Sequence, residues 1–317
     1  MTALHAPHRR APARDEAERF LVDLFDSLWA RYRERMTYVE AYERVVAAHG
    51  ATFTNDHVAF RTIAWQTPGL GIATIARLFE ALGYRHAGCY AFPDKHLSSL
   101  HFQHTNPALP RLFVSELWAF ELEPEALFAL ERVLASHRPP WSDRDLAALH
   151  RIGEVPREVR AELLDRTIRF FSELPWDVPQ RRDVLLLAAH SQFGAWVALN
   201  GYDVNHFTAS VDSHGASALD DIEKTVAAMR AAGIPMKDAI EGERGSPLRQ
   251  SSTAAVVREF AVMDDDVPGT LDWTYAYFEI AERPLVVDPA TGRASRFDGF
   301  LGGQATHLFE MTRTATR

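Results

Sequence analysis

The sequence predicts an α+β fold in which two β-α-β-β-β modules form one cupped sheet, with helices before the first module and between the two. Three observations support this prediction. Apolar residues near the N-terminus recur at helical spacing, the order strand, helix, strand, strand, strand occurs twice, and the stretch between the two occurrences is amphipathic and helical. We divide the 317 residues into a tail and helical pair at 1–50, a first module at 51–122, a helical insertion at 123–185, a second module at 186–290 and a C-terminal segment at 291–317.

The N-terminal segment begins with a basic stretch and continues as helix. "MTALHAPHRR" lacks the apolar stretch of a signal peptide, and we interpret it as a frayed tail. Apolar side chains then recur at helical spacing over residues 16–35 and 37–48. The first of these stretches carries one apolar stripe, made of Phe20, Leu21, Leu24, Phe25, Leu28 and Trp29. We therefore expect two helices before the first module.

The first module follows as a strand, a helix and three strands. Residues 55–64 alternate between two faces as a strand does, and "IATIARLFEALG" has helical spacing that Gly83 can end. The three strands that we expect next are "YRHAGCYAF", "LSSLHFQH" and "RLFVSELWAF".

The insertion and the second module complete the predicted order. Residues 123–185 contain three amphipathic stretches, separated by "RPPW" and followed by "ELPWDVPQ". Beyond the insertion, the elements that we expect are a strand at "VNHFTASVD", a helix at "SALDDIEKTVAAMRAAG" and strands at "MKDAIEGE", "LRQSSTAAVV" and "TYAYFEIAE". We expect the insertion to lie outside the cup of the sheet.

Composition and charge argue against several classes of protein. With 47% hydrophobic and 24% charged residues, the chain resembles an ordinary globular protein. Its net charge of −9 argues against a nucleic-acid partner, and its one cysteine, Cys89, excludes an intramolecular disulfide and a cysteine-based metal site. No apolar run is long enough to span a bilayer. We therefore expect a cytoplasmic protein that binds neither membrane nor nucleic acid.

Three residues that could bind a metal occupy matched places in the repeat. His57 and His206 lie on the leading strands of the two modules, each shortly after an asparagine, and Glu279 lies on the polar face of the last strand. Two imidazoles and one carboxylate form a facial triad that leaves open positions on Fe(II). A single histidine in a strand is more often a hydrogen-bonded structural residue than a ligand. The matched positions of all three favour the metal site.

Four segments resemble a known family. "TNDHVAFRT", "PRLFVSEL", "LNGYDVNHFTASV" and "YFEIAER" are similar to the signature segments of the iron-dependent 2-oxoadipate dioxygenase/decarboxylase family, whose fold is related to the vicinal oxygen chelate fold. The resemblance runs from about residue 50 to the "AER" segment and is interrupted by the insertion. It implies that His57, His206 and Glu279 bind Fe(II) and that Arg61 binds the substrate. Glu282 is the alternative carboxylate, but it would face away from the two histidines.

The resemblance also implies a reaction. A non-haem Fe(II) dioxygenase of this family uses O2 to convert a 2-oxo dicarboxylic acid such as 2-oxoadipate into a 2-hydroxy acid one carbon shorter, 2-hydroxyglutarate, and releases CO2. Gln250 and Ser252 share one face of a strand that resembles the glutamine-bearing strand of 4-hydroxyphenylpyruvate dioxygenase. We expect both to contact substrate, with simple strand packing as the alternative. The C-terminal segment would close over the cup or else cover a sheet edge.

Other interpretations remain open at this point. Arg61 could pair with an internal acidic residue instead of a substrate carboxylate. The same three ligands could hold Zn²⁺ or Mn²⁺ in a lyase, isomerase or hydrolase, because ligand type alone does not determine the metal. The chain could also bind a metal or a small acid without turnover.

Overall fold

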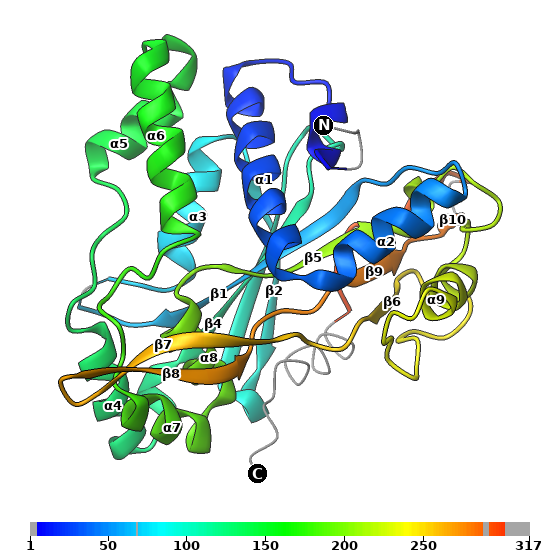
Figure 1. Cartoon of the computed structure of the whole chain (residues 1–317). Coiled ribbons are helices and arrows are strands. Elements are labelled where there is room, and N and C mark those ends of the chain that lie inside the picture. The colour runs from blue at the N-terminus through cyan, green and yellow to red at the C-terminus, as the bar shows by residue number, and fades with distance from the viewer. Residues whose placement is uncertain (1–4, 68, 288–291, 302–317) are drawn as a thin grey trace.

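A curved sheet of seven strands forms the centre of the computed structural model, which describes residues 5–67, 69–287 and 292–301 (Figure 1). The strands are β1 (Asn55–Ala64), β2 (Arg85–Phe92), β3 (Leu97–Gln103), β4 (Arg111–Trp118), β5 (Val204–Ser210), β6 (Arg249–Ser252) and β9 (Glu279–Glu282). They lie in the order β2-β3-β4-β1-β5-β9-β6. The leading strands of the two predicted modules, β1 and β5, are therefore neighbours at the centre of the sheet.

The two halves of the sheet have the same pairing. In the first half β1 pairs parallel with β4, β4 antiparallel with β3, and β3 antiparallel with β2. In the second half β5 pairs parallel with β9, and β9 antiparallel with β6. Two antiparallel bridges, Met236 with Thr253 and Glu241 with Gln250, continue this pattern beyond β6. The antiparallel pairing of β1 with β5 joins the halves, and the predicted pair of modules is confirmed.

The second half differs from the predicted strands in several places. Residues 236–243 form only the two isolated bridges, and residues 275–278 are not a strand. A hairpin that we did not predict, β7 (Val257–Asp264) and β8 (Val267–Thr274), follows β6 in the sequence and forms a separate two-stranded sheet (Figure 1). A further small sheet pairs β10 (Leu285–Val287) with β11 (Ala294–Arg296).

The backbone of residues 275–278 leaves the main sheet because its polar groups have other partners. The amide of Tyr275 donates to the carbonyl of Val256, and the Tyr275 carbonyl accepts from the Trp196 indole. The amide of Phe278 donates to the Thr253 hydroxyl, and its carbonyl accepts from the Thr253 amide. Since these bonds replace ladder bonds, the continuous strand predicted at "TYAYFEIAE" begins only at Glu279.

Helices surround the sheet, and none of those described is long and apolar enough to cross a membrane. They are α1 (Glu16–Arg35), α2 (Thr37–Ala48), α3 (Ile72–Ala81), α4 (Pro124–Leu134), α5 (Asp143–His150), α6 (Arg157–Phe170), α7 (Arg181–His190), α8 (Gln192–Asn200) and α9 (Ile222–Ala231). Short 3-10 helices occupy Pro7–Arg10, Pro93–Lys95, Ala119–Glu121, Ile152–Glu154 and Val211–Ser213. The N-terminal helical pair is present as predicted.

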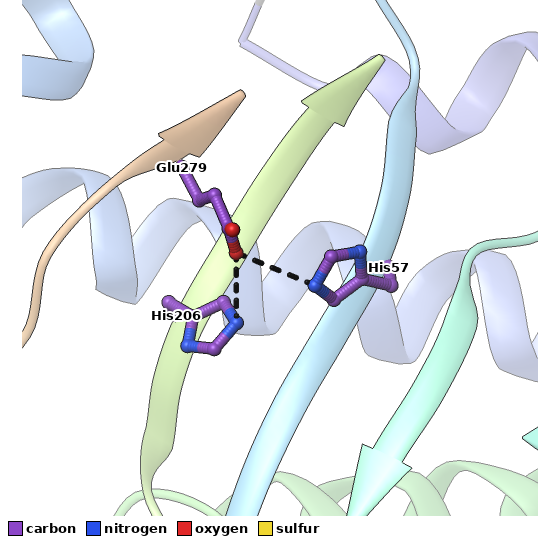
Figure 2. A group of neighbouring side chains, drawn as sticks. All are labelled: His57, His206 and Glu279. Atoms are coloured by element: carbon purple, nitrogen blue, oxygen red, sulfur yellow. Dashed lines mark ion pairs between the residues drawn. The ribbon is translucent and has the colours of Figure 1, made fainter. Parts of the chain in front are cut away.

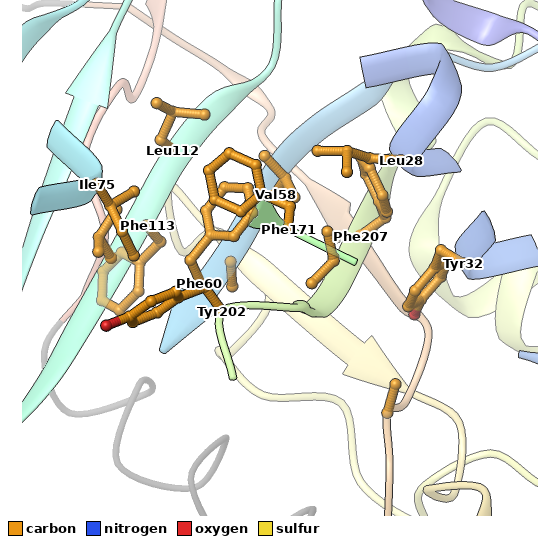
Figure 3. Packing of buried hydrophobic residues seen from close by; sticks show 14 of the residues in the cluster. Leu28, Tyr32, Val58, Phe60, Ile75, Leu112, Phe113, Phe171, Tyr202 and Phe207 are labelled. Carbon is orange, nitrogen blue, oxygen red and sulfur yellow. The ribbon is translucent and has the colours of Figure 1, made fainter. Parts of the chain in front are cut away.

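Aromatic side chains pack the helices against the face of the sheet that bears Phe60 and Phe207. The ring of Trp29 on α1 meets Phe207 on β5 at a centroid distance of 5.2 Å, and Phe171 after α6 meets Phe60 on β1 at 4.7 Å. Figure 3 shows this core, with Leu28 and Tyr32 approaching Phe207. α1 and the end of α6 therefore cover the face that bears Phe60 and Phe207, while α8 packs against Arg61 on the opposite face.

The helical stretch is longer than predicted. The boundary placed at residue 185 falls inside α7, and α8 continues the helices to Asn200. All residues of α8 from Phe193 to Asn200 are buried. A helix that is buried on every side has no polar face, so the amphipathic pattern that located the other helices is absent from it.

The tail before α1 is packed where it is described, and the prediction of a frayed tail is wrong for this part. His8 is buried, and both its amide and its Nδ1 contact Oδ1 of Asp26, at 3.1 and 3.0 Å. The side chain of Arg9 also pairs with Asp26. A buried carboxylate requires polar partners, and the tail supplies them.

Candidate metal centre

His57, His206 and Glu279 come together from β1, β5 and β9 (Figure 2). The strand register places them on one face, because His57 is paired with Thr208, Ala59 with His206, and Thr208 with Glu279. Oε2 of Glu279 lies 3.4 Å from Nε2 of His57 and 3.2 Å from Nε2 of His206. One donor atom from each residue lies within 4.8 Å of the other two. The spatial cluster that the repeat predicted is therefore present.

Hydrogen bonds fix the orientation of both imidazoles. Nδ1 of His57 donates to Oδ1 of Asp56 at 2.8 Å, and Nδ1 of His206 donates to Oδ1 of Asn205 at 3.0 Å. With the proton on Nδ1, the lone pair of each ring lies on Nε2, the nitrogen that faces Glu279. This is the tautomer that a histidine needs to bind a metal through Nε2.

The three side chains are buried, with 1%, 4% and 0% of His57, His206 and Glu279 exposed. Among the described residues, Nε2 of His206 has no hydrogen-bond partner. Burial lowers the pKa of His206. A carboxylate that faces two imidazole lone pairs in a dry site lacks a cation, and a divalent metal ion fits this donor set.

Two further side chains hold the carboxylate of Glu279. The Thr208 hydroxyl donates to Oε2 at 2.9 Å, and the Gln250 amide donates to Oε1. Gln250, which we expected to contact substrate, thus contacts Glu279, the candidate metal ligand, directly. Ser252 is paired with Glu279 across β6 and β9, and its buried hydroxyl has no hydrogen-bond partner in the described part of the chain.

Arg61 lies further along β1 and is 3% exposed. Its guanidinium is 5.0 Å from the ring centre of Phe193 and 5.0 Å from that of Trp196, both on α8. Burial lowers the pKa of Arg61 to about 10, so the side chain stays positive at neutral pH. The structure thus places a buried cation on the strand of His57.

Aromatic rings border the cluster on two sides. The ring of Tyr277 stacks on His206, with centroids 4.7 Å apart and an interplanar angle of 28°. The ring of Phe300 meets His57 edge-on at 4.9 Å and also contacts Phe113 at 4.8 Å. Phe300 belongs to the C-terminal segment, and residues 302–317 of that segment lie outside the described residues.

The carboxylate next to His57 is held by two arginines. Arg283 donates from Nε and Nη2 to the two oxygens of Asp56, at 2.7 and 3.0 Å, and Arg111 donates to Oδ2 at 3.1 Å. Burial would raise the pKa of Asp56, but Arg283, His57 and Arg111 outweigh it and hold the pKa well below its usual range. Asp56 therefore stays charged beside the proton on His57.

The structure places one residue apart from the cluster, as the sequence predicted, and adds residues that the sequence did not single out. Glu282 pairs with Arg249 at 3.1 Å and takes no part in the cluster, as we expected. Thr208 could have been found, since it lies two residues after His206 and so on the same face. Arg283 and Phe300 had no local signal, because their contacts reach residues far away in the chain.

Comparison with known proteins places the chain among enzymes of one type. A family model described as 2-oxoadipate dioxygenase/decarboxylase matches residues 23–312. The chloroplastic/amyloplastic 2-oxoadipate dioxygenase/decarboxylase of Oryza sativa subsp. japonica is 28% identical over 292 residues, which cover 85% of this chain and 72% of that protein.

Two solved structures share the fold. The hydroxyglutarate synthase from Oryza sativa, in complex with 2-oxoadipate, superposes with a TM-score of 0.75 at 25% identity and covers 96% of each chain. A putative glyoxalase superfamily protein from Ralstonia eutropha JMP134 gives a TM-score of 0.76 at 24% identity, over 95% of this chain and 99% of that chain. The predicted vicinal oxygen chelate-like fold is confirmed.

Proposed function

Since the chain belongs to the 2-oxoadipate dioxygenase/decarboxylase family, we propose that it is an Fe(II)-dependent enzyme acting on a 2-oxo dicarboxylic acid such as 2-oxoadipate. In the proposed reaction, 2-oxoadipate and one O2 give 2-hydroxyglutarate and one CO2. Both atoms of dioxygen end in the products, and the oxidation of the 2-oxo acid supplies the electrons. No separate reductant is needed.

The observation that carries this proposal is the donor set of His57, His206 and Glu279, with a buried imidazole nitrogen that lacks a partner among the described residues. Two imidazoles and one carboxylate suit Fe(II) and leave positions for a substrate and O2. When bound, Fe(II) would supply the redox chemistry with O2 and polarise the 2-oxo acid.

The side chains around the donors keep them in place. Asp56 and Asn205 accept the Nδ1 protons of the two imidazoles, so neither ring can rotate without losing a bond. Thr208 and Gln250 hold the two oxygens of Glu279. The carboxylate thereby keeps one orientation, which a site with only three protein ligands requires.

Arg61 is the group that we assign to the second carboxylate of the substrate. A guanidinium can hold a carboxylate through two parallel hydrogen bonds, and the rings of Phe193 and Trp196 restrict the plane of the Arg61 guanidinium. Arg61 follows His57 by four residues, roughly 13 Å along an extended strand, and its side chain can reach back toward the cluster. Such a spacing suits a substrate with acidic groups at both ends.

The test is oxygen uptake by the full chain loaded with Fe(II) without air. We expect one O2 consumed and one CO2 released per 2-oxoadipate, with ¹⁸O from labelled O2 in the 2-hydroxyglutarate. Turnover with Zn²⁺ and without O2 would instead support a lyase, isomerase or hydrolase. Tight binding of 2-oxoadipate with no uptake would support a binding module.

A further inference from the structure

Arg283 touches neither imidazole, yet it joins two structures that both contact His57. We propose that Arg283 is a positioning residue which, through Asp56, links the docking of residues 297–300 to metal binding by His57. This inference rests on the metal site of the proposed function. It adds a residue and a segment to that site which the three donors alone do not include.

The first half of the link is the ion pair with Asp56. Asp56 and Arg283 are 6% and 2% exposed, and Arg283 uses two nitrogens to bind both carboxylate oxygens. The oxygen that accepts from Nη2 of Arg283, Oδ1, is also the oxygen that accepts the Nδ1 proton of His57. The position of Arg283 therefore sets the position of the atom that orients the imidazole.

The second half of the link is the C-terminal segment. Nη1 of Arg283 donates to the carbonyls of Phe297 and Gly299, at 2.9 and 2.7 Å. The next residue, Phe300, lies edge-on to His57 and has its ring centre 5.2 Å from the Arg283 guanidinium. Its amide donates to the Tyr90 hydroxyl at 3.0 Å. The guanidinium of Arg283 thus binds both the Asp56 carboxylate, which orients His57, and the backbone next to Phe300, whose ring contacts His57.

These contacts form a closed cycle of four residues and segments. Starting from Arg283, it runs through Asp56 to His57, from His57 to Phe300, and from the backbone before Phe300 to Arg283 again. If docking of the segment steadies His57 and so strengthens metal binding, then metal binding must strengthen docking by the same factor, because the coupling of two equilibria is reciprocal.

Arg111 makes a second connection between the same parts, but a weaker one. It binds Oδ2 of Asp56 at 3.1 Å and Oδ1 of Asp298 at 2.5 Å. The side chain of Asp298 is 68% exposed, and exposed ion pairs contribute little. Arg283 is buried and bonds to backbone carbonyls, so its contacts are not screened by solvent. We therefore assign the link to Arg283.

The test measures metal affinity without turnover. Apo protein is titrated with Co²⁺, whose visible absorption reports the ligands, for wild type, Arg283→Lys and Phe300→Ala. Lysine keeps the charge but cannot bind both oxygens of Asp56 and two carbonyls together, so we expect Arg283→Lys to lose about tenfold in affinity. The matched control is Arg249→Lys, a buried arginine that pairs with Glu223 and Glu282 away from the cluster and should bind Co²⁺ as wild type does.

Hydrogen exchange then tests the reciprocal effect. We expect Zn²⁺, which has no redox chemistry, to slow exchange of the amides of residues 297–301 in wild type and in Arg249→Lys. In Arg283→Lys the slowing should shrink by the same factor as the loss in Co²⁺ affinity.

Each outcome decides between the two proposals. If wild type binds neither metal, the metal site itself is wrong. If wild type binds Co²⁺ and both Arg283→Lys and Phe300→Ala bind it equally well, the site stands and the link fails. If Arg283→Lys does not fold, Phe300→Ala alone tests the link. This variant interrupts the cycle of contacts at Phe300 and leaves no buried charge unpaired. An unchanged Co²⁺ affinity of Phe300→Ala would then overturn the inference.

Discussion

The guanidinium of Arg61 lies 5.0 Å from the ring centre of Trp196. This contact brings together the first module and the helix directly before the second, since Arg61 is on β1 and Trp196 on α8. An aromatic ring offsets part of the cost of burying a cation and restricts the plane of a guanidinium. Helix α8 therefore holds the Arg61 guanidinium in the orientation in which we propose that it binds a substrate carboxylate.

Arg61→Lys should keep the positive charge and lose both the stacking and the paired hydrogen bonds to a carboxylate. We expect kcat/KM for 2-oxoadipate to fall by about 10- to 100-fold, which corresponds to roughly 1.4–3 kcal/mol. Metal affinity should stay the same. Steady-state oxygen uptake measures the first quantity and Co²⁺ titration the second. Equal kcat/KM in the two proteins would refute the role assigned to Arg61.

Replacing His57, His206 or Glu279 by alanine should remove the bound metal. Each variant loses one of three protein ligands, so we expect the metal content to fall from one per chain to near zero while the circular dichroism stays unchanged. Metal analysis after dialysis checks this. His137→Ala is the control, because this histidine is bonded to Tyr202 and is not part of the cluster. Full occupancy in any of the three variants would exclude that residue as a ligand.

Gln250 and Ser252 provide a matched pair on one strand. Gln250→Leu removes the amide that donates to Oε1 of Glu279, and we expect about a tenfold loss of metal affinity. Ser252→Ala removes a hydroxyl with no partner among the described residues, and affinity should change less than twofold. Co²⁺ titration compares them. The same loss in both variants would mean that packing of β6, and not the bond to Glu279, is responsible.

Glu18 should make the stability of the protein sensitive to acid. Its carboxylate accepts hydrogen bonds from Arg14 and Asn106. Burial would raise the pKa of Glu18, but these bonds outweigh it and lower the pKa from 4.5 to about 2. Because the folded state has the lower pKa, the stabilisation is present above pH 4.5 and is lost as the pH falls toward 2.

Glu18→Gln should therefore lower the free energy of unfolding by about 2 kcal/mol at pH 7, and the difference from wild type should narrow below pH 4.5. Urea unfolding at pH 7 and pH 4 measures this. Glu16→Gln, which affects a more exposed pair with Arg19, should lower the free energy of unfolding clearly less than Glu18→Gln does. A difference for Glu18→Gln that does not depend on pH would contradict the assigned pKa.

The strands of the first module and the grouping of His57, His206 and Glu279 could be predicted because their signals are local. Side chains alternate along a strand, so placing His57 on β1 also fixed its face. The repeat then related His57 to His206. The hairpin of β7 and β8 was missed because half of its side chains are exposed and it lies outside the repeated order.

Contacts across the chain could not be predicted in this way. Arg283 and Asp56 are separated by 227 positions, and no local pattern marks either as a partner of the other. Asp56 follows an asparagine in "TND", which favours a turn as readily as a buried ion pair. Trp196 lies on a helix without a polar face, so its position beside Arg61 depended on knowing the packing of α8.

The pairing of β9 between β5 and β6 also has a consequence for protein synthesis. A growing chain exposes His57 and His206 well before the ribosome adds Glu279, and domains fold from the N-terminal side as they are made. A stalled chain that ends before Glu279 would carry both imidazoles but lack the carboxylate and the last central strand. A metal ion that needs all three side chains would then be held only by chains translated past Glu279.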